Sequence, residues 1–261
     1  MPPTTASPSL RWLTADDSFP EADEAWGPDT PHPGLLAAGG VVDSTHLKAA
    51  YARGIFPWYS PHSPPLWWSP DPRMVLQPGN FRLHRSLEKT LRRFAQDHTA
   101  QIRIDTAFAQ VIDACSRIPR EGQDGTWIVD DIKAAYTQLH REGLAHSVEV
   151  WRDERLVAGL YCVALGRAVF GESMFTTEND GSKIALTALV HLCRRHGVAM
   201  IDCQQNTRHL AFMGAAEVPR RQFLQAVREG IALAPVRWEF ARTDWADIIS
   251  LSEITSPIVD E

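Results

Sequence analysis

Long apolar runs are absent from the 261 residues of this chain. No stretch of 18 uncharged apolar residues occurs, which excludes a membrane-spanning helix. The first ten residues, MPPTTASPSL, contain neither a basic segment nor an apolar one, so we expect no secretory signal there. Because they are rich in Pro, Ser and Thr, residues 1–10 are predicted to be disordered.

Cysteine is scarce, and the cysteines present have no metal-binding or redox spacing. The four residues lie in apolar segments without a CxxC pair: Cys115, Cys162, Cys193 and Cys203. This distribution predicts reduced cysteines in the core of a cytoplasmic protein.

The short motifs of several enzyme classes are also missing. GxSxG, HExxH, Walker A and paired CxxC sequences do not occur. The ten histidines are scattered without an i, i+4 pair, so we predict no metal site and expect no cofactor.

The net charge of −6 argues against indiscriminate nucleic-acid binding, but one segment carries a local basic face. Residues Leu83–Phe94 are predicted to be helical. Four basic side chains in this segment recur at i, i+4, i+7 and i+8 and therefore share one face: Arg85, Lys89, Arg92 and Arg93. This face is either solvated or a set of phosphate contacts.

The most informative stretch runs from Leu156 to Gln204. Two apolar, β-branched-rich segments, Leu156–Leu165 and Ala168–Phe175, flank Gly166-Arg167 and predict an antiparallel hairpin. A helix capped by Ser182 and ended by Gly197 follows, and Val198–Cys203 is predicted to be a short buried strand.

Two carboxylates interrupt this apolar stretch. Glu172 lies inside the second predicted strand and Asp202 lies at the end of the third. A buried carboxylate costs several kcal/mol unless it is paired or neutralised, so we expect both to be functional. Asp202 and Gln204, at i and i+2 on a strand, should project from the same face.

The remaining pattern predicts an α+β fold with a mainly antiparallel sheet flanked by helices. Helices are expected from Asp43 or Ser44 to Arg53 and over Thr106–Arg117, Val129–Arg141, Thr207–Met213 and Pro219–Glu229; Leu144–Trp151 should be a half-buried strand. Ile55–Arg73 contains six prolines and three tryptophans, which predicts an irregular, stiff wall or a platform for a nucleobase. A turn at Gln77–Asn80 divides a small N-terminal domain, residues 1–78, from residues 79–261.

Several blocks resemble one enzyme family. GESMF, SK-x-AL and IDCQ-x-x-T-x-HL, with PGLLAAGG, AYARGIFPWYS and LWWSPDPR upstream, are similar to the leucyl/phenylalanyl-tRNA–protein transferases from about Pro33 to Phe223. The resemblance implies a GNAT-like acyltransferase domain after a small N-terminal domain. It also implies transfer of Leu or Phe, and we add Met, from aminoacyl-tRNA to proteins with N-terminal Arg or Lys, marking them for N-end-rule degradation. We expect a monomer.

The resemblance also implies roles for individual residues. It places Asp202 and Gln204 in the reaction centre and implies that the basic helical face contacts tRNA phosphates. Within that centre we expect Gln204 to orient the amine, and Asp202 to polarise Gln204 or stabilise the ammonium. We expect Glu172 to bind the donor or acceptor amine. The resemblance further implies that the site for the tRNA 3′-adenosine or for the acceptor is lined by Tyr51, Trp58, Trp127 and Tyr136.

Six apolar side chains from the central strands and helix converge, either as ordinary core or as a pocket for Leu or Phe: Leu160, Met174, Leu186, Leu189, Cys193 and Ile201. The resemblance favours the pocket for Met174, Leu186 and Ile201. Relatives commonly carry larger aromatic residues at Leu189 and Cys193, so the pocket is expected to be roomier or reshaped here. In the loop between GESMF and SK, relatives often carry a basic residue near Thr177 and an asparagine near Asp180.

Two other functions compete with aminoacyl transfer. Arg194–Ala199 fits the R-x-x-G-x-A pattern of acetyl-CoA-dependent N-acetyltransferases, but a phosphate loop must lead into a helix N-terminus, and this match is predicted at a helix C-terminus. A non-catalytic RNA-binding module would leave Glu172 and Asp202 unexplained.

Overall fold

The computed structural model describes residues 9–118 and 126–255. Residues 1–8 lie outside the described residues, so the prediction of disorder for residues 1–10 concerns only two residues that the structure describes. One of these two, Leu10, packs against the core. Among the described helices, none combines the length and apolar character that a bilayer crossing requires.

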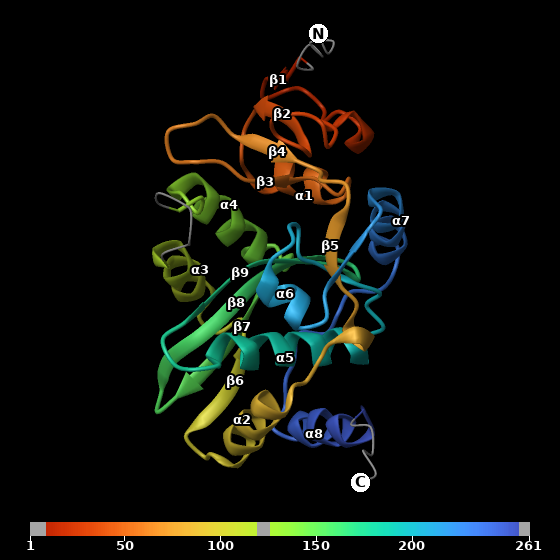
Figure 1. Ribbon diagram of the computed structural model, residues 1–261. Coiled ribbons are helices and arrows are strands. Elements are labelled where there is room, and N and C mark those ends of the chain that lie inside the picture. Colours follow the sequence, from red (N-terminus) through yellow and green to blue (C-terminus); the bar gives the residue numbers. More distant parts are fainter. Residues whose placement is uncertain (1–8, 119–125, 256–261) are drawn as a thin grey trace.

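The N-terminal part forms a four-stranded sheet in the order β1-β2-β4-β3, at the top of Figure 1. Its elements are β1 (Arg11–Leu13), the 3-10 helix η1 (Ala22–Glu24), β2 (Leu35–Gly39), α1 (Ser44–Tyr51), β3 (Phe56–Pro57) and β4 (Leu66–Trp68). The predicted start of α1 is confirmed, because the Asp43 side chain caps it by accepting from the His46 backbone N–H at 2.8 Å.

The rest of the chain is built on a seven-stranded sheet in the order β11-β5-β10-β9-β8-β7-β6. Its strands are β5 (Arg73–Leu76), β6 (Ala100–Ile104), β7 (Ala145–Arg152), β8 (Arg155–Leu165), β9 (Ala168–Thr176), β10 (Ile201–Asp202) and β11 (Ala216–Val218). Neighbouring strands are antiparallel except β9 and β10, which are parallel. The predicted combination of strands and helices around a mainly antiparallel sheet is confirmed.

Helices cover both faces of this sheet (Figure 1). One face packs on α5 (Gly181–Arg195), and the other packs on α3 (Phe108–Arg117) and α4 (Asp130–Arg141). Alternate β8 residues divide accordingly: Tyr161 joins the core under α3 and α4, and Leu160 joins the core under α5. The remaining helices are η2 (Pro78–Asn80), α2 (Arg85–Gln96), α6 (Arg208–Phe212), α7 (Arg220–Ile231) and α8 (Asp244–Thr255).

The predicted hairpin of β8 and β9 is confirmed, with Leu165 opposite Ala168. Gly166 in its turn has φ +61, and an added Cβ would lie 2.6 Å from the Gly230 carbonyl oxygen. A side chain there would be strained and would also collide with the backbone at the C-terminal end of α7. Helix α5 begins at Gly181 after Asp180, so the predicted cap at Ser182 is wrong by two residues.

Two strand predictions need correction. Strand β7 is buried on both faces rather than on one, because helices cover both sides of the sheet, and Ser147 and Glu149 have no exposed surface. The Glu149 carboxylate is satisfied by the Ala107 N–H at 2.7 Å and the Trp151 indole N–H at 2.9 Å. The third predicted strand, Val198–Cys203, shrinks to Ile201–Asp202.

Strand β5 precedes the predicted domain boundary after residue 78, yet it lies in the seven-stranded sheet between β11 and β10. We therefore propose that the boundary between the two units lies before Arg73, where the chain leaves the smaller sheet.

Candidate active site

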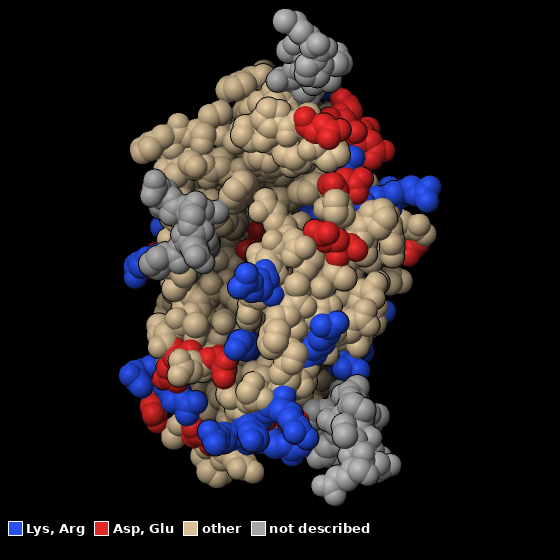
Figure 2. All heavy atoms as spheres, in the orientation of Figure 1, with Lys and Arg blue, Asp and Glu red and all other residues tan. Residues whose placement is uncertain are grey.

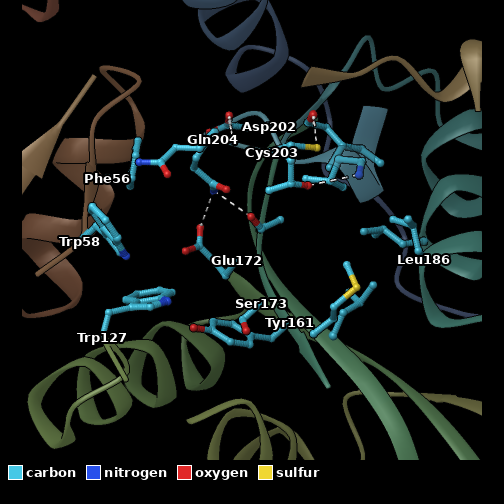
Figure 3. Close-up of a pocket in the computed structure, with 18 of the residues that line it drawn as sticks. Phe56, Trp58, Trp127, Tyr161, Glu172, Ser173, Leu186, Asp202, Cys203 and Gln204 are labelled. Carbon is cyan, nitrogen blue, oxygen red and sulfur yellow. Dashed lines mark hydrogen bonds between the residues drawn. The ribbon is translucent and has the colours of Figure 1, made fainter. Parts of the chain in front are cut away.

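A pocket of about 330 Å³ lies where segments of the smaller sheet meet β8, β9, β10 and α5. Figure 2 shows it as a hollow with acidic atoms at its depth. In Figure 3, Phe56, Trp58 and Trp127 line one side, Leu186 lies on the opposite side, and Glu172 lies between them. Most of the predicted site residues line this pocket: Trp58, Trp127, Leu160, Glu172, Met174, Leu186, Leu189, Ile201, Asp202 and Gln204.

The apolar side of the pocket comes from three elements. Leu160 and Met174 are paired across β8 and β9, α5 contributes Leu186 and Leu189, and Ile201 comes from β10. The prediction that Cys193 belongs to this set is wrong, because Cys193 is fully buried in the core and does not line the pocket. The five remaining side chains form an apolar surface of the kind that accepts an aliphatic or aromatic side chain.

Tyr51 and Tyr136 do not line the pocket, contrary to the prediction, but both hold Glu172 from behind. The Tyr51 hydroxyl donates to Glu172 Oε1 at 2.6 Å, and the Tyr136 hydroxyl donates to Oε2 at 3.1 Å. Burial, and then the charge of Glu172, raises the pKa of each phenol well above its usual range. Both hydroxyls therefore stay protonated and act as donors.

The Glu172 carboxyl group faces the pocket, and protein encloses its other sides. Burial raises its pKa most, and the charge of Asp202 adds to that rise; hydrogen bonds from Tyr51 and Tyr136 and the charge of Arg73 oppose it. The balance raises the pKa of Glu172 to about 8. The two phenol oxygens also lie 2.5 Å apart, so the two tyrosines and Glu172 form one hydrogen-bonded cluster.

Asp202 is buried at the end of β10, with 1% of its surface exposed. The Arg73 guanidinium binds it through two parallel hydrogen bonds, Nε to Oδ1 at 2.7 Å and Nη2 to Oδ2 at 2.6 Å. Arg73 is itself fully buried. The predicted carboxylate therefore has a charged partner that makes its burial tolerable.

The prediction that Asp202 and Gln204 project from one face of a strand is wrong, because the chain leaves β10 after Asp202. Gln204 has φ +55, a left-handed conformation that costs roughly 1–2 kcal/mol for a residue with a side chain. Its backbone N–H donates to Asp202 Oδ1 at 2.9 Å. Its side-chain Nε2 donates to the Gly171 carbonyl at 2.8 Å and lies 3.5 Å from Glu172 Oε1 (Figure 3).

Comparison with known proteins agrees with this geometry. Residues 75–228 match the family described as leucyl/phenylalanyl-tRNA protein transferase, and residues 42–71 match the N-terminal domain of that family. The chain belongs to this family. The resemblance drawn from the sequence blocks is confirmed, and with it an aminoacyltransferase family.

Two relatives illustrate the extent of the similarity. The leucyl/phenylalanyl-tRNA–protein transferase of Albidiferax ferrireducens is 57% identical over 243 residues, which cover 93% of this chain and 96% of that protein. The protein of the same name from Polaromonas sp. is 54% identical over 246 residues, covering 94% and 96%. A solved domain of a putative lysylphosphatidylglycerol synthetase from Agrobacterium fabrum is only distantly similar, with 12% identity, a TM-score of 0.33, and coverage of 84% and 71%.

Some residues of this candidate site were missed in the sequence. Phe56 and Tyr161 line the pocket, and Arg73 supports it from outside. Arg73 carried a readable signal, because it opens an apolar strand, and the cost of a buried charge applies to a guanidinium as much as to a carboxylate. Phe56 and Tyr161 carried none, because aromatic residues in apolar segments are usually plain core.

The basic face of this transferase-family chain lies on α2, at the lower end of the molecule in Figure 1, away from α6. Arg85, Lys89 and Arg93 are exposed, whereas Arg92 donates to Glu88 at 2.9 Å one turn away. Figure 2 shows Lys and Arg side chains gathered over this helix. The basic helical face predicted from the spacing is therefore present, and the ion pair with Glu88 partly neutralises its charge at Arg92.

Two further features lie outside the pocket. Among the described residues, one group could hold a metal ion, His191, Asp244 and Asp247 between α5 and α8, and the Arg195 guanidinium already donates to Asp244 at 3.1 Å. The R-x-x-G-x-A match at Arg194–Ala199 lies at the C-terminal end of α5, as predicted, so it offers no helix N-terminus to a pyrophosphate.

Proposed function

We propose that this protein transfers Leu or Phe, and also Met, from aminoacyl-tRNA to the α-amino group of proteins with N-terminal Arg or Lys. The observation that carries the proposal is an apolar pocket of about 330 Å³ bordered by Glu172 and the Gln204 amide. The pocket offers space for an apolar side chain, and its polar border offers groups for an amine. The names of the relatives agree, since they specify leucyl- or phenylalanyl-tRNA and a protein.

The proposed reaction needs little from the protein besides positioning. The α-amine nitrogen attacks the carbonyl carbon of the aminoacyl ester, the new amide bond forms, and the bond from that carbon to the terminal ribose oxygen of tRNA breaks. The amine loses one proton and the ribose oxygen gains one. Because the pKa of an α-amine is about 7.7–8.0, an appreciable fraction of the amine is already neutral near pH 7, and orientation supplies much of the acceleration.

We assign roles by position in the pocket. Gln204 orients the amine through its side-chain amide, which already points at Glu172. Glu172 binds the amine and exchanges its proton, a role that suits a group whose pKa is raised to about 8, near that of the amine itself. Trp58 and Trp127 lie on the side of the pocket opposite Leu186. They offer aromatic faces on which the 3′-terminal base of tRNA can stack.

The basic face of α2 is proposed to bind tRNA phosphates, with Arg85, Lys89 and Arg93 as the main contacts and Arg92 as a weaker one. From the resemblance we further propose that the unit built on the seven-stranded sheet has a GNAT-like fold. The same resemblance motivates the proposal that the protein marks its targets for N-end-rule degradation. We also propose a cytoplasmic protein, from the distribution of its cysteines, and a monomer.

A transfer assay tests the proposal. Radiolabelled Leu-tRNA is incubated with the protein and a peptide beginning with Arg or Lys, and label in the peptide is measured beside a matched peptide with another N-terminal residue. We expect transfer only to the first peptide. No transfer to either peptide, or saturable binding and transfer with acetyl-CoA, would refute it.

A further inference from the structure

Arg73 has no part in the roles assigned so far, although it carries a full charge inside the protein. It opens β5, has no exposed surface, and does not line the pocket. Burying a guanidinium costs free energy that only good partners offset. Its partners therefore indicate what the charge is for.

The surroundings of Arg73 fix it tightly. Its Nε and Nη2 donate to the two carboxylate oxygens of Asp202, so the planar fork meets the carboxylate in one orientation. Its guanidinium carbon lies 4.7 Å from the centre of the Phe56 ring and 4.5 Å from that of Phe223, so aromatic rings cover it. Phe56 comes from the smaller sheet and Phe223 from α7, so the guanidinium joins three parts of the chain.

Asp202 passes this constraint on to Gln204. The oxygen Oδ1 that accepts from Arg73 also accepts from the Gln204 backbone N–H at 2.9 Å. That hydrogen bond supports the left-handed conformation of Gln204, whose φ is +55. The same conformation carries the side-chain amide toward Gly171 and Glu172 (Figure 3).

We propose that Arg73 is a positioning residue for aminoacyl transfer: through Asp202 it fixes the backbone of Gln204 and so aims the Gln204 amide at the reacting amine. This inference rests on the proposed function. It makes Asp202 an anchor rather than the proton acceptor, because both of its oxygens are occupied and 1% of its surface is exposed.

The first test is Arg73→Lys, which keeps the charge but has no planar fork to hold both oxygens. We expect kcat to fall about 10²-fold, the size of effect that a misplacement of about 1 Å produces, with KM for aminoacyl-tRNA nearly unchanged. Arg220→Lys is the matched control, since Arg220 is also buried but donates to the Ser69 carbonyl and makes no described hydrogen bond or ion pair to Asp202. That control should keep wild-type kcat per folded molecule.

A second test separates positioning from simple stability through pH. The charged and titratable groups facing Asp202 are Arg73 from β5, Glu172 from β9 and the neighbouring Cys203 thiol. In Arg73→Gln the counter-charge is gone, so the buried Asp202 carboxylate faces Glu172 without a compensating cation. We expect kcat of this variant to decrease further toward low pH, and Arg73→Gln/Asp202→Asn to lack that decrease.

The outcomes distinguish this inference from the proposed function. If the wild type transfers no amino acid in the same assay, the proposed function fails. If the wild type transfers and Arg73→Lys keeps full kcat per folded molecule, or the pH profiles of Arg73→Gln and the double variant coincide, Arg73 is structural only and the inference fails. Should Arg73→Gln not fold, the kcat and KM of Arg73→Lys still decide.

Discussion

The charged side chains of the pocket and those of α2 differ in almost every physical respect. Asp202 and Glu172 are enclosed, and each accepts several hydrogen bonds from fixed donors. Arg85, Lys89 and Arg93 lie on an open helix surface, and among the four basic residues of that face only Arg92 has a described ion pair within the helix. Enclosed charges interact strongly with the few groups around them and are little screened by salt, whereas exposed charges act together and are screened by salt.

This difference predicts different kinds of failure. A change in the pocket should affect the rate, the pH dependence or the choice of side chain, because few atoms share each task. A change on α2 should alter tRNA affinity gradually and in proportion to the number of charges removed.

The largest effect is expected for Gln204→Ala. Removing the amide that orients the amine should lower the transfer rate by about 10²–10⁴-fold, the range observed when positioned proton-transfer or hydrogen-bonding groups are lost. Affinity for tRNA should remain, since the amide lies in the pocket and not on α2. Single-turnover transfer and tRNA binding are measured together, with Gln225→Ala on α7 as control. A rate loss that disappears at saturating peptide would show that Gln204 only binds the acceptor.

The next effect concerns Glu172 and pH. The pKa of this carboxyl group is raised from 4.5 to about 8 in the folded protein, so the folded state keeps a proton that the unfolded chain loses above pH 4.5. The free energy of unfolding should therefore fall as pH rises from about 4.5 to about 8, by at most roughly 5 kcal/mol at about 1.4 kcal/mol per pKa unit.

Glu172→Gln should remove this decrease, because an amide does not titrate. The measurement is denaturant unfolding of both proteins at several pH values in that window. Glu217→Gln, at an exposed carboxylate, should behave as the wild type. Parallel pH profiles for wild type and Glu172→Gln would contradict the raised pKa.

A smaller effect is expected in the apolar part of the pocket. Met174→Ala or Ile201→Ala should weaken use of the Leu donor by about 1–3 kcal/mol and that of the larger Phe donor by less. The ratio of kcat/KM for Leu-tRNA and Phe-tRNA measures this directly. Met213→Ala removes a fully buried methionine outside the pocket and should lower stability without changing the ratio. If the pocket variants behave like Met213→Ala, those residues are plain core.

The smallest change per residue is expected on α2. Replacing one basic residue by Gln should flatten the plot of log tRNA-binding constant against log salt concentration by about 0.7–0.9 in slope. This applies to Arg85, Lys89 and Arg93. Arg92→Gln should do less because Glu88 already pairs with it. A minimal aminoacyl-adenosine donor, which lacks the contacted phosphates, should be used at an unchanged rate. Arg141→Gln, at the exposed end of α4, serves as control.

The sequence by itself was sufficient for features that depend on neighbouring residues. The β8–β9 hairpin, the start of α1 and the end of α5 follow from apolar alternation, a capping aspartate and a left-handed glycine. The cost of burying charge was enough to single out Glu172 and Asp202, because both interrupt apolar segments. The family blocks then connected those carboxylates to a transferase.

Only the tertiary structure decided what each carboxylate contacts. Asp202 is paired with Arg73, 129 residues earlier in the sequence, because β5 and β10 are neighbours in the sheet. Tyr51, 121 residues before Glu172, donates to it from behind, and Tyr136 does the same from α4. Strand order and helix packing set these contacts, and no local pattern encodes them. The turn at Gln204 was missed for a related reason, since a left-handed glutamine persists only where a distant anchor such as Asp202 with Arg73 supports it.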